Sequence, residues 1–168
     1  MRAPCLRNRS LQRIRFPGED EHNGWRLMYR HILLPLDGSE LAEQAIPFAV
    51  AQAERFSAEL ILLQAVEPIL YTRNLAALDE ARQQRLKRAG DYLGGVAANI
   101  RERGIQVQIE VTEEAPNAAI TRYSETNQVD LIVLCSRGRS GPSRWLMGSV
   151  ADRIVRGANV AVLLVRAS

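Results

Sequence analysis

Short runs of apolar residues recur along this 168-residue chain, and longer amphipathic segments separate them. A continuous apolar run of about four to eight residues is typical of a strand that is buried on both faces in a parallel sheet. The expected strands are His31–Leu36, Glu59–Val66, Ile105–Val111, Asp130–Leu134 and Val160–Val165. The third alternates apolar and polar residues, which predicts a half-exposed strand near a sheet edge.

The segments between these runs carry apolar residues at three- and four-residue spacing, which predicts helices that cover the sheet. Strands that alternate with helices indicate an α/β fold, here a three-layer, doubly wound, five-stranded parallel sheet. Ser39 or Asp37 is expected to cap the first helix. The expected helices run from Ser39 to about Phe56, from Leu75 to Arg103, from Pro116 to about Asn127, and from Ser149 to about Arg156.

A glycine-rich segment, Cys135 to Ser149, follows the fourth expected strand and leads into the last helix. Glycine lets the backbone approach a ligand closely, and the free N–H groups at a helix start attract anions. Ser149 is placed either to cap this helix or to donate its hydroxyl group to a phosphate. The segment predicts a phosphate site, with a ligand-free connection as the alternative. In such sheets ligands bind beyond the carboxyl ends of the strands, so Asp37 and Cys135 are expected to face one crevice.

The basic residues are unevenly distributed. Residues 1–28 hold six arginines and three acidic residues, whereas the remainder holds 16 basic and 16 acidic residues. We expect residues 1–28 to be a disordered basic extension, and residues 29–168 to form the folded domain. A transit peptide, a basic arm for nucleic acid or membrane, and an upstream start codon are the alternatives for the extension. The neutral domain gives no charge argument for nucleic acid binding.

Several protein classes lack their required residues here. No apolar run approaches the roughly 20 residues that span a bilayer, so no membrane association is expected. The two cysteines, Cys5 and Cys135, form no disulfide framework, which fits a cytoplasmic location. The only lysine, Lys87, lies inside an expected helix, which excludes a phosphate-binding loop of the GxxxxGK type. Only Gly38 follows the first strand, which argues against a dinucleotide-binding enzyme.

The glycine segment resembles the nucleotide-binding signature of the universal stress protein family. In that signature a glycine, two further residues and a second glycine are followed by nine residues and then by glycine and serine or threonine. Gly138, the nine-residue spacing and Gly148-Ser149 match, whereas Cys135 stands at the first glycine. The resemblance extends to the opening Ile32–Ser39, to Val129–Val133 and to Arg139-Ser140-Gly141. It spans about Met28 to Val165.

This resemblance implies the strand order 3-2-1-4-5 of the adenine-nucleotide alpha-hydrolase-like fold, and a homodimer paired through Val160–Val165. It also implies an ATP-binding stress-response module with regulatory or protective function, in which Mg²⁺ accompanies the nucleotide and Asp37 is the candidate residue near the metal. No metal site of the protein's own and no catalytic residue are expected. The implied ATP-binding positions are Pro35, Leu36, Asp37, Ala65, Leu134, Cys135, Gly138, Gly148, Ser149 and Val150.

Alternatives remain open for function and for single residues. The protein is either an ATP-binding module, a nucleotide-free dimer that acts through protein contacts, or a slow ATP hydrolase. Arg137, Arg139 and Arg144 either neutralise phosphates or are solvated loop residues, and solvation is the default for arginine. The basic residues Arg82, Arg85, Lys87 and Arg88 are interpreted as a solvated helix face. Cys135 is interpreted as a buried, unreactive cysteine, with a redox-sensitive thiol as the alternative.

Overall fold

The computed structural model describes residues 28–68, 75–138 and 147–166. Its five strands form one parallel sheet in the order β3-β2-β1-β4-β5, which confirms the expected order. Each strand begins and ends within about two residues of its predicted limits. The strands are β1 (His31–Pro35), β2 (Glu59–Ala65), β3 (Val107–Thr112), β4 (Leu131–Cys135) and β5 (Ala161–Val165).

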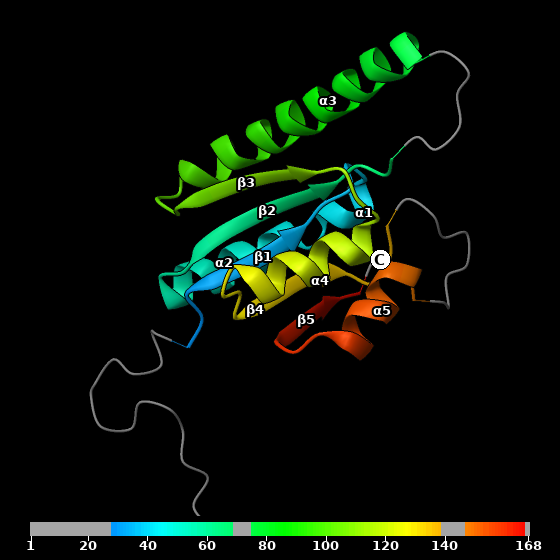
Figure 1. Cartoon of the computed structure of the whole chain (residues 1–168). Helices are drawn as coiled ribbons and strands as arrows, with labels where there is room; N and C mark the ends of the chain where they lie inside the picture. Colours follow the sequence, from blue (N-terminus) through cyan, green and yellow to red (C-terminus); the bar gives the residue numbers. More distant parts are fainter. Residues whose placement is uncertain (1–27, 69–74, 139–146, 167–168) are drawn as a thin grey trace, which may run out of the picture.

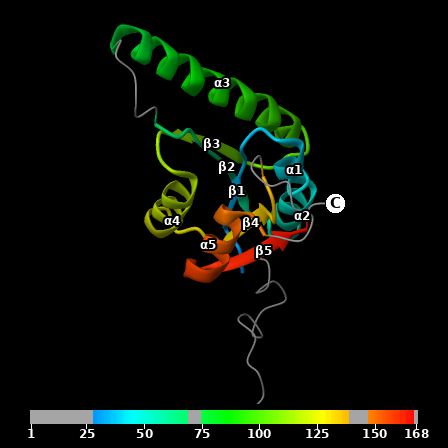
Figure 2. The same cartoon turned by 90° about the vertical axis from the view of Figure 1, so that its right-hand side faces the viewer.

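Helices cover both faces of this sheet (Figure 1). Figure 2 shows α4 and α5 on one face and α1 and α2 on the other, while α3 runs along the side of the sheet where β3 lies. Leu93, Ala97 and Ile100 of α3 belong to the same buried cluster as residues of α1 and α2. The predicted three-layer arrangement is therefore confirmed. The helices are α1 (Glu40–Glu43), α2 (Ile46–Phe56), α3 (Leu75–Arg101), α4 (Pro116–Thr126) and α5 (Ser149–Gly157).

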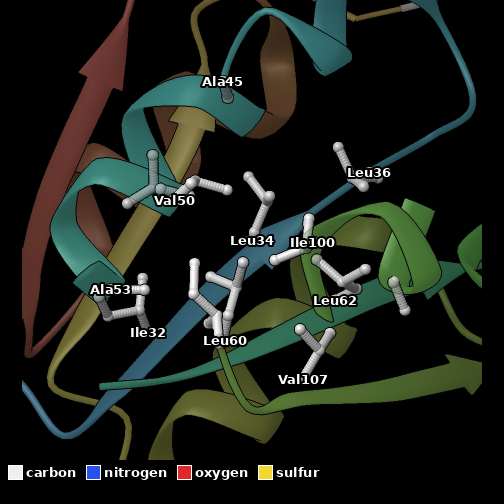
Figure 3. Packing of buried hydrophobic residues seen from close by; sticks show 14 of the residues in the cluster. Ile32, Leu34, Leu36, Ala45, Val50, Ala53, Leu60, Leu62, Ile100 and Val107 are labelled. Atoms are coloured by element: carbon white, nitrogen blue, oxygen red, sulfur yellow. The ribbon is translucent and has the colours of Figure 1, made fainter. Parts of the chain in front are cut away.

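Alternate residues of the central strands supply two separate cores. Ile32 and Leu34 of β1 face α2 and α3 together with Leu60 and Leu62 of β2, as Figure 3 shows. Leu33, between them, faces α4 and α5 instead. Because side chains alternate across a strand, a strand with helices on both faces must be apolar throughout. This explains the continuous apolar runs in the sequence.

The first helical segment is divided, although the sequence pattern predicted one continuous helix to about Phe56. α1 ends at Glu43, and Ala45 precedes α2 as its N-cap residue. Pro47 lies in the first turn of α2. Proline has no N–H group to donate, and its ring clashes with the carbonyl group four residues earlier, which here belongs to Glu43. The break is therefore encoded by Pro47, and the prediction of an uninterrupted helix was wrong.

The amino end of β1 is fixed to its neighbours. The N–H groups of Arg30 and His31 donate to Oδ2 of Asp130 over 2.7 and 2.9 Å. The ring of Tyr29 packs edge-on against Phe56, with ring centroids 4.9 Å apart. The chain thus joins the sheet at the edge where the strands begin.

β5 forms one edge of the sheet, next to β4. The carbonyl oxygen of Val165 accepts a hydrogen bond of 2.7 Å from the N–H group of Ser136. In a parallel ladder every second residue directs both its N–H and its C=O toward the same neighbour. Ala161, Leu163 and Val165 therefore pair with β4, whereas Val162 and Leu164 direct their backbone groups outward.

Some predictions concern residues outside the described ranges. The disordered extension, Cys5 and the loop residues Arg139, Ser140, Gly141 and Arg144 all lie there, so the domain boundary stays a prediction. Among the described helices, none combines the length and apolar character that crossing a bilayer requires.

Candidate functional site

A cavity of about 730 Å³ lies beyond the carboxyl ends of β1, β2 and β4. The helices that follow β1 and β4 cover opposite faces of the sheet, so strand order reverses between these two neighbours. Open α/β sheets bind ligands at such a reversal, and the volume lies within the range of small-molecule pockets. All ten residues predicted from the sequence line this cavity, namely Pro35, Leu36, Asp37, Ala65, Leu134, Cys135, Gly138, Gly148, Ser149 and Val150. That they bind ATP stays a prediction.

Asp37 lies directly beyond β1, and its carboxylate is held in place by the turn that starts α1. Oδ1 accepts hydrogen bonds from the backbone N–H and the hydroxyl group of Ser39, over 3.0 and 2.6 Å. Ser39 is the N-cap residue of α1, because its Oγ accepts from the N–H group of Ala42. Of the two candidate caps, the structure therefore assigns the role to Ser39, and Asp37 orients Ser39. Gly38 takes a φ of +77° in this turn, a conformation that favours glycine.

Gly138 allows the loop after β4 to come close to this carboxylate. A Cβ atom added to Gly138 would lie 2.6 Å from Oδ2 of Asp37, which is shorter than any ordinary contact. Gly148 has more space around it than Gly138. A Cβ atom added to Gly148 would lie 3.4 Å from its nearest neighbour, the carbonyl oxygen of Ser136. The N–H group of Gly148 donates to that same oxygen over 2.8 Å. The structure thus brings the two signature glycines together at the mouth of the cavity.

The first turn of α5 borders the cavity. Gly148 is the N-cap residue, and no side chain caps the helix. Of the two roles expected for Ser149, the structure excludes the cap, because Ser149 is the first residue of the helix itself. Its role as a donor to phosphate stays a prediction. The first N–H groups of any helix lack partners within the helix, and together they carry a partial positive charge. This turn can therefore donate to an anion in the cavity.

α3 supplies a wall of the cavity that the sequence analysis missed. With 27 residues, α3 is roughly 40 Å long, whereas strands of five to seven residues span roughly 20 Å. Its carboxyl end is anchored on β3, where Arg101 donates to the carbonyl oxygen of Val107 over 2.6 Å. The amino-terminal half consequently extends past the carboxyl ends of the strands, as Figure 1 shows. Arg85, Arg88, Ala89 and Tyr92 lie along one stripe of α3 and line the cavity.

The two arginines of this wall differ from their neighbours Arg82 and Lys87 on α3. Arg82 and Lys87 form ion pairs with Glu113 and Asp91. Within the described residues, neither Arg85 nor Arg88 has a hydrogen bond or ion pair. Arg85 is half-buried and Arg88 is exposed at the cavity. The interpretation of the basic run as a purely solvated face therefore fits Lys87 but not Arg85.

Tyr92 joins α3 to α1. Its hydroxyl group donates to Oε1 of Glu43 over 2.9 Å. Burial raises the pKa of Tyr92 above its usual value, and the hydrogen bond to Glu43 and the negative charges of Glu43 and Asp37 raise it further. Tyr92 therefore stays protonated and holds α3 over the cavity. The signal available in the sequence was the spacing of Arg85, Arg88 and Tyr92 along one helix face.

The fold and the loop geometry agree with a match to a known family. Residues 28–166 match the sequence profile of the universal stress protein family. The chain belongs to this family. A universal stress protein of Methanocaldococcus jannaschii is 31% identical over 141 residues, which cover 83% of each chain.

Solved universal stress proteins share the fold. The protein from Lactobacillus plantarum matches with a TM-score of 0.75 and 28% identity, over 82% of this chain and 98% of that one. A universal stress protein described in complex with cAMP matches with a TM-score of 0.58 and 24% identity, over 83% of this chain and 98% of that one. The second likeness concerns the fold alone.

Two features of this universal stress protein bear on chemistry at the site. Cys135 ends β4 with only 7% of its surface exposed, which agrees with the interpretation of a buried cysteine. Within the described residues, no group of three or more His, Cys, Asp or Glu side chains is arranged to hold a metal ion. The carboxylates that line the cavity are those of Asp37 and Glu67.

Proposed function

We propose that this universal stress protein binds ATP together with Mg²⁺ in the cavity, and acts as a regulatory or protective module in the cytoplasm. The observation that carries the proposal is that all ten positions implied by the family resemblance line one cavity, next to a helix start that no side chain caps. A cavity of about 730 Å³ has room for a nucleotide.

The phosphates are assigned to the end of the cavity at β4 and α5. There the N–H groups of the first turn of α5, and the hydroxyl group of Ser149, donate to phosphate oxygens. Gly138 and Gly148 leave room for this approach, because neither carries a side chain. A universal stress protein of the same fold is described in complex with cAMP, which is an adenine nucleotide.

Asp37 fits the role of a residue near the metal. Mg²⁺ in proteins is commonly held by one or two carboxylates together with the phosphates of the ligand. Oδ1 of Asp37 is fixed by Ser39, and Oδ2 lies at Gly138, where the phosphates are assigned. A bound Mg²⁺ would neutralise phosphate charge beside this carboxylate.

The opposite end of the cavity is assigned to the adenosine. Pro35, Leu36 and Ala65 line it with apolar surface at the ends of β1 and β2. A flat base with an apolar face loses little by leaving water for such surroundings. The proposal assigns binding and no catalytic step to these residues.

A second candidate function is a dimeric module that works through protein contacts, with or without nucleotide. The outward backbone groups of Val162 and Leu164 on the edge strand β5 favour it, because unpaired strand edges recruit further strands. The simplest partner is β5 of a second copy, paired antiparallel about a two-fold axis.

Isothermal titration calorimetry of the purified protein with ATP, with and without Mg²⁺, tests the nucleotide proposal. We expect binding that Mg²⁺ strengthens, and a rise in melting temperature with ATP. The variant Gly148→Ala should fold normally, because its Cβ atom meets only ordinary contacts, yet it should bind ATP at least about tenfold more weakly. Absence of binding and of any thermal shift at millimolar ATP would refute the proposal and leave the dimeric module.

A further inference from the structure

Gln64 places a polar group at the cavity, in a strand whose other interior residues are apolar. It is the second-last residue of β2 and points to the same face as Leu60 and Leu62. Its side chain lines the cavity next to the turn at Gly38. Nε2 lies 4.0 Å from the position that a Cβ atom of Gly38 would occupy.

The carbonyl oxygen Oε1 of Gln64 is buried and, among the described residues, accepts no hydrogen bond. Buried acceptors are nearly always satisfied, because an unpaired one has lost its hydrogen bonds to water without replacement. Such an atom in a ligand cavity is explained if the ligand supplies the missing donor. The atom therefore indicates a ligand with an N–H or O–H group at this position.

The position of Gln64 decides which part of a nucleotide it meets. The phosphates are assigned to Gly138 and α5, at the end of β4. Gln64 lies at the end of β2, and β1 separates β2 from β4 in the sheet. An extended nucleotide with its phosphates at α5 consequently places its base toward Gln64. This step rests on the proposed function.

We propose that Gln64 determines base specificity, by accepting a hydrogen bond from the exocyclic amino group of adenine. Adenine presents an N–H donor at its six-position, whereas hypoxanthine and guanine present a carbonyl oxygen there. In the amide orientation of this structure, Oε1 of Gln64 and a 6-oxo oxygen would face one another, repel and both remain without a donor. The cavity consequently selects adenine over 6-oxopurines through Gln64.

Competition between ATP and inosine 5′-triphosphate tests this role, because the two differ at the six-position of the base. The parent protein should prefer ATP by at least about tenfold, measured by calorimetry with Mg²⁺. Gln64→Leu should lose most of this preference, whereas Gln64→Glu, which retains acceptor oxygens, should keep it. Gln84→Leu, on the exposed face of α3 and outside the cavity, is the matched control and should keep the preference.

The unliganded protein gives an independent measurement. Replacing a buried, unsatisfied amide by an apolar side chain of similar size is neutral or stabilising, so the melting temperature of Gln64→Leu without nucleotide should not fall. If Gln64→Leu fails to fold, Gln64→Met supplies the same comparison. An unchanged preference in a variant that still binds ATP would overturn the role of Gln64 and leave the proposed function intact. Absence of binding by both nucleotides to the parent protein would overturn both.

Discussion

A Cβ atom on Gly138 would lie 2.6 Å from Oδ2 of Asp37, so the loop after β4 and the turn after β1 can meet only if residue 138 is glycine. We predict that Gly138→Ala displaces the Asp37 carboxylate from Ser39. The free energy of unfolding should fall by about 1 kcal/mol, because hydrogen bonds to a carboxylate are disturbed. Chemical denaturation measures this loss.

A double-mutant cycle identifies the cause of that loss. In an Asp37→Ala background the carboxylate is absent, so Gly138→Ala should cost little further stability. Equal losses in both backgrounds would show that the contact with Asp37 is not responsible.

We predict that the α3 arginines contribute to nucleotide affinity through charge. The double variant Arg85→Gln, Arg88→Gln should bind ATP several-fold more weakly at low ionic strength, because two cations at the cavity attract the triphosphate. The difference should shrink as salt is added, because partly exposed charges are screened. Lys87→Gln is the control, since Lys87 pairs with Asp91 and does not line the cavity. An equal effect of Lys87→Gln would indicate a general charge effect of the helix.

We predict that the domain loses stability in alkali through Tyr92. Its pKa is raised by burial, by the hydrogen bond to Glu43 and by nearby negative charge. Above the usual pKa of tyrosine, near 10, the unfolded chain releases this proton more readily than the folded protein does. The stabilisation from Tyr92 is therefore complete below about pH 10 and is lost as pH rises toward the higher pKa of the folded state.

Tyr92→Phe should flatten this alkaline decline in unfolding free energy, measured by denaturation at several pH values. It should also lower stability near neutral pH by about 1 kcal/mol, because the bond to Glu43 is lost. Part of the decline should remain, because burial also raises the pKa of Tyr123, together with the charges of Glu110 and Glu59. An unchanged alkaline decline would contradict the role of Tyr92.

We predict that β5 forms the dimer contact through Val162 and Leu164. Proline at either position removes an outward N–H group, so Val162→Pro or Leu164→Pro should weaken a dimer while the ladder to β4 is retained. Leu163→Pro removes a donor that pairs with β4 and should destabilise the domain itself. Sedimentation velocity and thermal unfolding together separate these effects. A parent protein that is monomeric across micromolar concentrations would contradict the dimer.

The limits of sequence reasoning are visible in β5. The apolar run Val160–Val165 was enough to predict a strand, because length and pattern define a strand. Its position at the edge came from the strand order that the family resemblance implies. Which residues direct their N–H groups outward depends on pairing with β4, and here the hydrogen bond from Ser136 to Val165 decides it. When all residues of a run are apolar, the sequence does not show which alternate residues direct their N–H groups outward.

In the site, too, some features could be predicted from the sequence and others depend on the tertiary structure. The ten predicted positions reached one cavity because they lie at the carboxyl ends of neighbouring strands or in the segments that follow, and these ends meet at one edge of the sheet. Arg85 and Tyr92 were missed because their contribution depends on how far α3 extends past that edge. Gln64 was missed because one polar residue inside an apolar strand is commonly no more than a solvent-facing position. Pro47, in contrast, carried a local signal that predicts the helix break.

The chain joins the sheet at the amino end of β1, where Asp130 and Phe56 hold it, and the cavity opens at the carboxyl end. The strand advances roughly 3.3 Å per residue, so five residues separate the two edges of the molecule. A fluorescent label or a sensor-surface tether attached at Met28 itself would therefore sit at the edge of the sheet opposite the cavity and leave the cavity facing solution.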